Sequence, residues 1–472
     1  MTIDNIPHAA KLAVAGATGF VGRALVARLE HAGHDVVPIA RSLGVDIADR
    51  DAVTAALAGR DAAYYLVHSM ATGASFRERD LELASTFGKA AARSGIGRVV
   101  YLGGLGDDPT SEHLASRQEV GCVLGAAGVP VVELRAAVVL GSGSISFEML
   151  RYLTERLPAM VCPRWVRTAI QPIAERDLLD ALERALTVDP GVYDIGGRDV
   201  TTYREMIESY ARVRKLRQRR VADIPFLTPR LSSYWIDLIT PVDRAVSHAL
   251  VESLATEVVV RGPSLGVASL GLDDAIRDAL DQQDLTVTAS LFELAPGLRD
   301  GVYVNRVEVP AEGHIAAALA EDLRAVGGRF DWYGARAGWW MRLASGRLAG
   351  ERLRLAKAEA IAAGTDVDWW TVVRCDPGVL VLRSRGWSPG DAWLGWRLEG
   401  GRLLQVGAFR PRGIPGFLYW KLLWPVHAVV FRWMARHRLT RARDIAARHG
   451  VRLSPHEREV VAAPERVAQT ND

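Results

Sequence analysis

Three glycines near the N-terminus have a spacing that suits the binding of a phosphate group. The run from Leu12 to Leu25 reads LAVAGATGFVGRAL, so Gly16, Gly19 and Gly22 join an apolar strand-like stretch to a helix-like one. Such glycines allow a tight turn, close approach of the backbone to a diphosphate and close packing of the helix, whose first amide groups attract an anion. The pattern predicts a dinucleotide-binding loop, with a purely structural turn as the alternative. The loop residues are Gly16, Thr18, Gly19, Phe20, Val21 and Gly22.

The residues after the second expected strand indicate which dinucleotide would bind. The strand Asp35 to Ala40 is followed by Arg41, where proteins that prefer NAD usually carry an acidic residue for the ribose hydroxyls. A guanidinium would instead pair with the 2′-phosphate of NADP. We therefore expect NADP to be preferred over NAD, with a plain surface arginine as the alternative. A short strand is expected at Val45 to Ile47, so we expect Asp46 and Ile47 to contact the adenine end of the cofactor. The alternative is that Asp46 only caps a turn.

A histidine follows another expected strand, from Ala63 to Val67, in the run LVHSM. Ligands of open α/β sheets bind beside the carboxyl ends of the strands. Leu66, Val67 and His68 are therefore expected to face the cofactor. His68 either takes a direct part in the chemistry or is held by local hydrogen bonds.

These residues need a parallel sheet to bring them together, and the first third of the chain has the pattern of one. Short β-branched runs alternate with stretches of helical periodicity, which is typical of a doubly wound α/β domain of the Rossmann type. Beyond Gly141 the pieces indicate a smaller substrate lobe, and the domain is expected to extend over 1–285. The expected strands are Leu12 to Ala15, Asp35 to Ala40, Val45 to Ile47, Ala63 to Val67, Val99 to Leu102 and Val131 to Val139.

The second half of the chain has a different element order. A strand (Val302 to Val309) and a helix (Glu312 to Ala325) precede several short strands and a long final helix. This order predicts an α+β helix-grip domain over 286–460, with a disordered tail over 461–472. Eleven of the thirteen tryptophans lie beyond residue 330, and they would line a site for a hydrophobic ligand or pack the core. The short strands are expected at Asp368 to Cys375, Val379 to Arg383, Trp393 to Glu399 and Arg402 to Phe409.

Composition narrows the class of protein. The chain of 472 residues carries 58 basic and 55 acidic side chains, a balance that argues against a nucleic-acid binder. Its three cysteines lack the spacing of a disulfide framework or a zinc site, and no metal site is expected. The N-terminus lacks the pattern of a signal peptide. We therefore expect a cytoplasmic protein.

One apolar segment near the C-terminus is about as long as a membrane is thick. Ile414 to Met434 is interrupted by Lys421 and Arg432, each costly in the middle of a bilayer. We expect a buried or amphipathic helix, with peripheral membrane contact and then a true span as alternatives. The basic stretch from Arg432 to Arg448 is expected to be a solvated face, with attraction to anionic lipid as the second interpretation.

Together these residues resemble the atypical short-chain dehydrogenase/reductase family, which has a Gly-x-x-Gly-x-x-Gly cofactor loop and includes triphenylmethane-reductase-like and NmrA-like proteins. They are also similar to a group of uncharacterised bacterial proteins with LVHSM, RWVR and LRAAVVLGSGS-type stretches, in which a Trp-rich domain of unknown function follows. The C-terminal half is similar, more loosely, to the polyketide cyclase and START-like superfamily. The resemblance implies NAD(P) binding and an oxidoreductase.

The chain departs from that family at its proton-transfer pair. Active members use Tyr-x-x-x-Lys, whereas the equivalent run here, SEHLASR, has His113 in place of the tyrosine and Arg117 in place of the lysine. His113 titrates in a suitable range for a general acid, and Arg117 could hydrogen-bond the nicotinamide ribose. Both are candidate catalytic residues.

The sequence therefore leaves three hypotheses of function. The first is an NAD(P)H-dependent oxidoreductase that acts on a hydrophobic, quinone-like or polyketide-like molecule and needs little acid assistance. The second is a noncatalytic dinucleotide-binding redox sensor or assembly module, consistent with the missing tyrosine. The third is a carrier of an apolar ligand through the C-terminal domain.

Overall fold

The computed structural model divides into two units, which we describe separately. Unit 1 comprises Met1–Asp284 and unit 2 comprises Leu285–Asp472. The division falls inside helix α10 (Leu272–Ala289), so the helical periodicity continues a little beyond the point where the sequence indicated a lapse. The residues that the structure describes are 9–68, 76–106, 112–223, 256–266, 268–299, 301–311, 315–326, 361–385 and 389–449.

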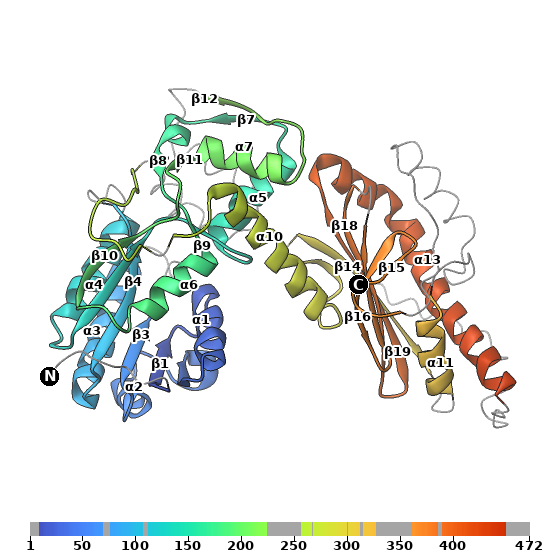
Figure 1. Cartoon of the computed structure of the whole chain (residues 1–472), viewed down its shortest axis with the longest axis horizontal. Helices are drawn as coiled ribbons and strands as arrows, with labels where there is room; N and C mark the ends of the chain where they lie inside the picture. The colour runs from blue at the N-terminus through green and yellow to red at the C-terminus, as the bar shows by residue number, and fades with distance from the viewer. Residues whose placement is uncertain are drawn as a thin grey trace. The chain divides into compact units, whose positions relative to one another are not determined.

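Unit 1 is built on a six-stranded parallel sheet with the strand order β10-β5-β4-β3-β1-β2 (Figure 1). The chain runs from β1 outward to β2, then crosses back to β3 on the other side of β1, so the strand order reverses between β1 and β3. In open α/β sheets a ligand binds at this reversal, beside the carboxyl ends of the strands. The strands are β1 (Lys11–Ala15), β2 (Asp35–Ile39), β3 (Ala62–Tyr65), β4 (Arg98–Gly104), β5 (Val131–Ala136) and β10 (Gly191–Ile195).

Helices cover both faces of this sheet, and the sequence of β1 explains why. Leu12 and Val14 point into a core cluster that also contains residues of α1 and α6, whereas Ala13 and Ala15 point into a second cluster with residues of α2, α3 and α4. Because successive side chains of a strand alternate between faces, a strand that is apolar throughout must be buried on both sides. The helices are α1 (Phe20–His31), α2 (Arg50–Leu57), α3 (Phe76–Ser94), α4 (Glu112–Gly125) and α6 (Glu175–Arg184).

Two expected strands of unit 1 differ in the structure. Val45 to Ile47 is not a strand, because Gly44 has φ +91° and Asp46 accepts hydrogen bonds from the Ala48 amide and from Arg41, which makes a local turn. The run Val131 to Val139 is also not continuous. β5 ends at Ala136, and the chain then leaves the sheet to form β6 (Val139–Leu140), which pairs with β9 (Ile173–Ala174).

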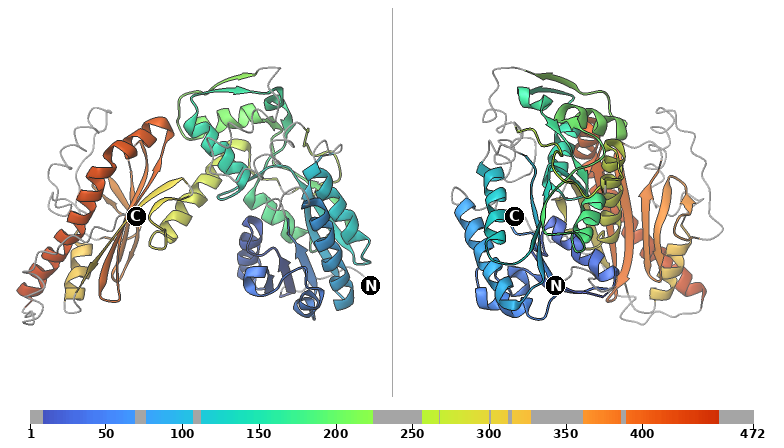
Figure 2. Two further views of the ribbon diagram at one scale, coloured as in Figure 1. Left: turned by 180° about the vertical axis from the view of Figure 1, so that it is seen from behind. Right: turned by 60° about the vertical axis from the view of Figure 1, so that its left-hand side comes forward.

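A smaller lobe follows the sheet in unit 1 and contains two short strand pairs with two helices (Figure 2). Its core joins Phe147, Met206 and Tyr210 to residues of α10. Sequence analysis expected such a lobe without fixing its register. Its elements are α5 (Ile145–Arg156), β7 (Ala159–Cys162), β8 (Ala169–Ile170), β11 (Thr201–Thr202), α7 (Tyr203–Val213) and β12 (Arg220–Asp223).

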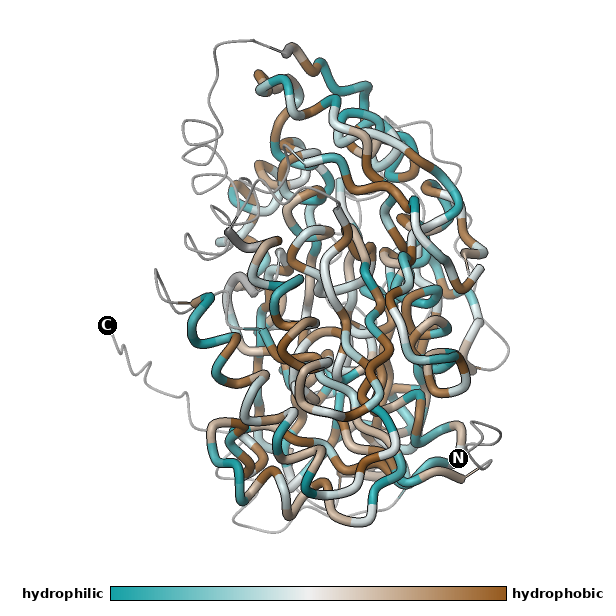
Figure 3. The backbone as a smooth tube through the Cα atoms, turned by 90° about the vertical axis from the view of Figure 1, so that its left-hand side faces the viewer, coloured by the Kyte–Doolittle hydropathy of each residue, from teal (hydrophilic) through white to brown (hydrophobic). Residues whose placement is uncertain are grey.

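The hydropathy of the backbone follows these layers. In Figure 3 hydrophobic segments, in brown, are frequent toward the middle of the view, and hydrophilic segments, in teal, are frequent at its outer turns. The strands at the centre of the unit 1 sheet, β1 and β3, have nearly fully buried side chains, with only Lys11 exposed. Because these strands are packed on both faces, the positions of their carboxyl ends, where the candidate site lies, are well defined.

Unit 2 is a seven-stranded antiparallel sheet with the order β13-β14-β19-β18-β17-β16-β15. The long first strand, β14, pairs with the last strand, β19, and the strands between them form a meander. Helices α11 (Ala316–Arg324) and α13 (Gly413–Arg448) pack on one face. The strands are β13 (Gly297–Arg299), β14 (Val302–Pro310), β15 (Asp366–Val367), β16 (Trp370–Asp376), β17 (Val379–Ser384), β18 (Gly390–Glu399) and β19 (Arg402–Pro411).

The described tryptophans of the unit 2 sheet lie in its core. Trp396 packs in the cluster beneath α13 and donates from Nε1 to Gln405, while Trp393 faces the opposite cluster and donates to Thr288. Trp369 and Trp370 are also buried in the cluster beneath α13. These four tryptophans therefore pack in the core, which was one of the two roles expected for them, the other being to line a ligand site. Trp339, Trp340 and Trp387 lie outside the described residues.

A buried ion pair fastens α13 to α11, and it provides a first prediction. Asp322 is fully buried and accepts hydrogen bonds from Arg438 and Arg441, each at 2.7 Å, so part of the basic stretch expected to be a solvated face is in the core. Replacing Asp322 by alanine would leave the 1%-exposed Arg438 without its carboxylate. We expect a loss of about 3–5 kcal/mol in the free energy of unfolding. Urea denaturation measures this loss.

The matched control is an exposed ion pair on strand β16 of the same unit. Asp376→Ala removes the partner of Arg374, and both of these side chains are about half exposed. An exposed pair of this kind contributes less than about 1 kcal/mol. Equal effects of the two substitutions would show that the buried pair does not stabilise unit 2.

Candidate functional site

A cavity of about 850 Å³ opens at the carboxyl ends of β1, β3 and β4 in unit 1. It lies at the reversal of strand order, where the topology of an open α/β sheet places a ligand. One part of its wall comes from the glycine loop and the strand ends, and the other part comes from the smaller lobe. Nine of the predicted site residues line it, namely Gly16, Gly19, Phe20, Val21, Gly22, Leu66, Val67, His68 and Arg117.

The glycine loop is sterically closed to larger side chains at two of its three glycines. Gly16 has φ +84°, and a Cβ there would lie 2.7 Å from the Leu66 carbonyl oxygen. A Cβ on Gly22 would lie 2.1 Å from the Gly16 carbonyl oxygen, so the first turn of α1 packs directly on the loop. Gly19 has ordinary extended dihedral angles, and its Cβ position is tight but not blocked, at 3.2 Å from the same oxygen.

The beginning of α1 has the features of an anion site. Gly19 is the N-cap residue, no side chain caps the helix, and the first turn contains no acidic residue. The amide groups of this turn therefore have no side-chain acceptor of their own at the cavity wall, and they add to the positive end of the helix dipole. Phe20, Val21 and Gly22 carry these amide groups. The loop thus fits the diphosphate of a dinucleotide.

Four predicted cofactor residues lie outside the cavity wall. Thr18 is exposed, with its carbonyl oxygen bonded to Arg23, and Ile47 is buried in the core of the sheet. Arg41 is 74% exposed in its side chain and donates from Nε to Asp46 at 2.9 Å. The amide of Ala48 and the neighbouring Arg41 hold the pKa of Asp46 below its usual range. The assignment of these four residues to the cofactor stays a prediction.

A histidine and an aspartate form a pair in the cavity wall. Nδ1 of His68 lies 3.1 Å from Oδ2 of Asp80, a residue of α3 that is almost fully buried. Burial lowers the pKa of His68, and the hydrogen bond to Asp80 opposes that shift. An ionised Asp80 can only accept this hydrogen bond, so it would place a proton on Nδ1 of the imidazole and hold the ring in one orientation.

Arg117 and His113 stand where the Tyr–Lys pair is expected, and the structure describes the side chain of Arg117 alone. Arg117 lines the cavity, and its Nη2 donates to the carbonyl oxygens of Leu102 (2.9 Å) and Gly103 (3.2 Å) at the end of β4. Its guanidinium is thereby positioned beside the strand end. His113 lies in the first turn of α4, and its side chain is outside the described residues.

The part of the cavity wall in the smaller lobe is almost entirely apolar. Trp165 and Tyr203 meet edge to face at 5.7 Å between ring centroids, and thioether and aliphatic side chains of α5 and α7 continue the wall. Such a wall suits a flat or hydrophobic molecule. The lining residues here include Met149, Leu150, Leu153, Leu157, Met160, Cys162, Trp165, Val166, Tyr203, Met206 and Ile207.

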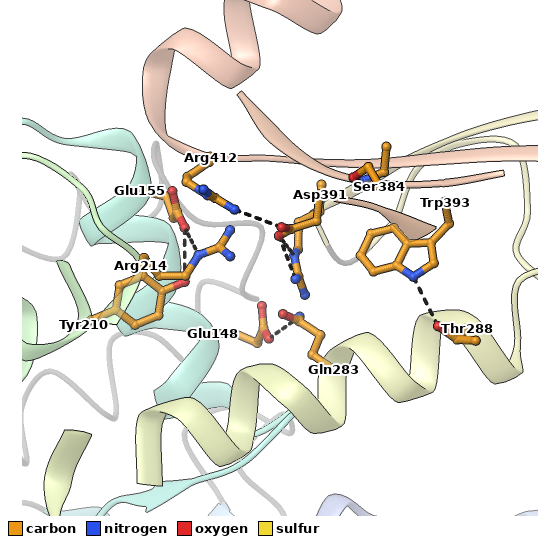
Figure 4. A network of polar contacts seen from close by, with 12 residues as sticks. Glu148, Glu155, Tyr210, Arg214, Gln283, Thr288, Ser384, Asp391, Trp393 and Arg412 are labelled. Atoms are coloured by element: carbon orange, nitrogen blue, oxygen red, sulfur yellow. Dashed lines mark hydrogen bonds and ion pairs between the residues drawn. The ribbon is translucent and has the colours of Figure 1, made fainter. Parts of the chain in front are cut away.

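A buried polar cluster holds α5 and α7 together behind this wall (Figure 4). Oε1 of Glu155 accepts hydrogen bonds from the hydroxyl of Tyr210 at 3.2 Å and from Nε of Arg214 at 3.0 Å. Glu148, also on α5, accepts from Gln283 of α10 at 3.2 Å. These contacts fix the helices that carry the apolar lining, because buried charges and amides tolerate little displacement from their partners.

Sequence reasoning missed the partner of His68 and most of the apolar wall. Asp80 carried one usable signal, since it lies three, four and seven residues before Leu83, Ala84 and Phe87 on the buried face of α3. An aspartate on an apolar helix face requires a partner. The apolar wall carried no such signal, because its side chains have the same types as ordinary core residues.

Comparison with known proteins gives separate matches for the two halves of the chain. Residues 12–116 match the model of the NAD-dependent epimerase/dehydratase family, and residues 298–434 match the model of a family of proteins of unknown function, DUF2867. Uncharacterised proteins of Mycobacterium tuberculosis and Mycobacterium bovis are 27% identical over 213 residues, which are 43% of this chain. The match spans 23% of the length of these curated relatives.

Solved structures similar to this chain are distant in sequence. Triphenylmethane reductase of a Citrobacter species in complex with NADP(H) is 16% identical, with a TM-score of 0.45 over 57% of this chain and 99% of that one. The Bordetella bronchiseptica enzyme WbmH in complex with NAD⁺ is 16% identical, with a TM-score of 0.43 over 58% and 97%. UDP-N-acetylglucosamine 4-epimerase of Bacillus cereus is 17% identical, with a TM-score of 0.40 over 52% and 99%.

The family match and the loop geometry define the class of unit 1. It contains a Rossmann-type parallel-sheet domain, and residues 12–116 of that domain match the NAD-dependent epimerase/dehydratase family. Unit 2 contains the domain of unknown function.

Proposed function

We propose that unit 1 is an NADPH-preferring reductase of a flat, hydrophobic acceptor of the quinone-like or polyketide-like type. One observation carries this proposal. The anion-binding glycine loop and the apolar wall of the smaller lobe belong to a single cavity, so a dinucleotide on the loop and an apolar molecule on the wall would share one space. The finer resemblance to triphenylmethane-reductase-like proteins agrees with an acceptor that needs little acid assistance.

In such a reaction the residues of the chain bind the cofactor and orient the acceptor. When bound, a reduced nicotinamide supplies a hydride, and a quinone-type acceptor takes up that hydride and one proton from water to become the hydroquinone. The amide groups of α1 bind the diphosphate, and the wall around Trp165 and Met206 orients the acceptor. Asp80 keeps the Nδ1 proton of His68 in place, so the imidazole presents a fixed polar edge to the cavity.

We assign to unit 2 a helix-grip, START-like fold as part of the same proposal. Its support is the pairing of the first long strand with the last, the meander between them and the long final helix on one face. Because the described tryptophans of its sheet pack in the core, we give unit 2 an accessory role, not that of the main ligand carrier.

We place the protein in the cytoplasm, where its described cysteines would stay reduced.

Turnover with a panel of acceptors tests the proposed reaction. The purified full chain is mixed with NADPH and with benzoquinones, naphthoquinones and triphenylmethane dyes, and the absorbance of NADPH is followed. The proposal expects one NADPH consumed for each acceptor reduced. Tight NADPH binding without turnover on any acceptor would overturn it in favour of a noncatalytic redox sensor, which the engagement of Arg117 with backbone carbonyls already favours as the second candidate.

The cofactor preference gives a second prediction. Arg41 is exposed, and its ion pair among the described residues is with Asp46; an exposed pair costs little to break, so the guanidinium can turn to a 2′-phosphate. We expect Arg41→Ala to weaken NADPH binding by roughly tenfold to 100-fold while NADH binding changes less than about twofold. Fluorescence titration with both dinucleotides measures the two dissociation constants, and Arg93→Ala, which removes an exposed ion pair with Asp51 outside the cavity, is the control. Equal losses of affinity for NADPH and NADH would show that Arg41 does not bind the 2′-phosphate.

A further inference from the structure

We propose that the first half of α13 is a membrane-surface anchor that lies in the interface of an anionic lipid bilayer. Its outward face is defined by Leu418, Leu422, Val426, Val429 and Trp433, and we call it the apolar stripe. The spacing of these residues, four, four, three and four, places them on one side of a helix. This surface is independent of the cavity in unit 1 and of the proposed reaction.

The exposure of the stripe is unusual for a soluble domain. Leu422 is 75% and Val429 69% exposed, and nine of the fifteen large hydrophobic residues exposed in the described part of the chain lie on α13 between Ile414 and Trp433. A contiguous apolar patch marks an interaction site, because leaving it in water is unfavourable. The expected burial therefore holds only for the inward face of this segment, and its outward face is apolar and exposed.

The inward face of the same half is packed against the unit 2 sheet. Trp420 is 4% exposed and stacks on Phe409 at 5.1 Å and on Tyr303 at 5.5 Å between ring centroids. Among the described residues, α13 is long and apolar enough to cross a membrane by length and composition. A helix with one face packed on a sheet cannot also be surrounded by lipid, so the geometry favours a position in the plane of the interface.

Charge identifies the membrane surface as the partner. Lys421 and Arg432 are exposed and eleven residues apart, which is close to three helical turns, so they lie along one side of the stripe. From Gly400 to Arg443 the sequence contains no acidic residue. A second copy of the chain docked on the stripe would bring these cations together, and this part of the helix has no carboxylate to pair with them. Lipid phosphates would instead neutralise them.

Exposed aromatic residues agree with this position. Tyr419, Trp424 and Trp433 are each more than a third exposed on α13. Tryptophan and tyrosine are enriched at the level of lipid headgroups, where the ring is buried and the polar atom stays hydrated. Cation, apolar stripe and interfacial aromatic residue thus occur together on one half-helix.

Cosedimentation of the full chain with vesicles tests the anchor. Vesicles contain either phosphatidylcholine alone or phosphatidylcholine with phosphatidylglycerol. We expect binding to the anionic vesicles, weakened by salt, and a loss of at least about tenfold in the double variant Leu422→Glu/Val429→Glu. Lys421→Gln/Arg432→Gln should weaken anionic binding and leave the small neutral-vesicle signal unchanged.

The control replaces exposed apolar residues away from the stripe. Val192→Glu/Leu285→Glu changes the same net charge at 42% and 69% exposed positions and should bind anionic vesicles like the unchanged chain. Absence of binding to anionic vesicles, equal binding to neutral ones, or a dimer that the Leu422→Glu/Val429→Glu variant dissociates would each overturn the anchor. NADPH titration of the same samples reports separately on unit 1.

Discussion

Gly19→Asp is expected to abolish dinucleotide binding while unit 1 remains folded. The N-cap position of α1 tolerates aspartate, which would accept hydrogen bonds from the first-turn amide groups and stabilise the helix by a few tenths of a kcal/mol over glycine. The same carboxylate would occupy the anion site and repel the diphosphate. We expect NADPH affinity to fall by at least roughly 100-fold, with an unchanged or slightly higher melting temperature.

The matched control for this substitution is Gly19→Asn. Asparagine has nearly the same shape and also caps the helix, and it places a Cβ at the same position, 3.2 Å from the Gly16 carbonyl oxygen. Its loss of affinity should be smaller because it carries no charge. If the aspartate variant bound NADPH as tightly as the unchanged chain, the diphosphate would not bind at the beginning of α1.

Leu153→Asp is expected to impair the reaction without affecting cofactor binding. Leu153 lies on α5 in the apolar wall, away from the glycine loop. A carboxylate there must be desolvated whenever a hydrophobic acceptor enters, at a cost of about 3 kcal/mol, so kcat/KM should fall by roughly 100-fold. The dissociation constant of NADPH should change less than about twofold, as measured by fluorescence titration.

Two further variants make this result specific. Leu153→Trp fills the cavity without a charge and should also raise KM, which guards against a mere loss of folding in the aspartate variant. Val192→Asp places the same carboxylate on an exposed residue of β10 outside the cavity and should leave turnover unchanged. Unchanged kcat/KM in both Leu153 variants would show that the acceptor does not use this wall.

The parts of the site that could be predicted from the sequence are those encoded locally. The glycine loop is a contiguous run in which spacing dictates the turn, and Leu66 to His68 are expected at the end of a strand that must meet the loop in any doubly wound sheet, although β3 itself ends at Tyr65. Asp80 joins the site only because α3 packs back over β3. Val45 to Ile47 failed as a strand because Gly44 and the side chain of Asp46 form a turn, which outweighs the β propensity of valine and isoleucine.

Unit 2 shows a different limit of prediction. Its element order followed from the sequence, since antiparallel strands and a long helix leave clear periodicity. The outward face of α13 did not, because between Ile414 and Trp433 most residues are apolar on every side of the helix. Periodicity cannot then tell the packed face from the exposed one. The buried Arg438 was misjudged for the related reason that its partner, Asp322, is on another helix.

The most direct test of the central claim is calorimetric titration of the full chain with NADPH and with NADH. The account predicts one dinucleotide bound per chain, with NADPH bound more tightly, through the amide groups at the beginning of α1. Absence of binding heat for both dinucleotides, together with an unchanged melting temperature at saturating concentrations, would contradict it.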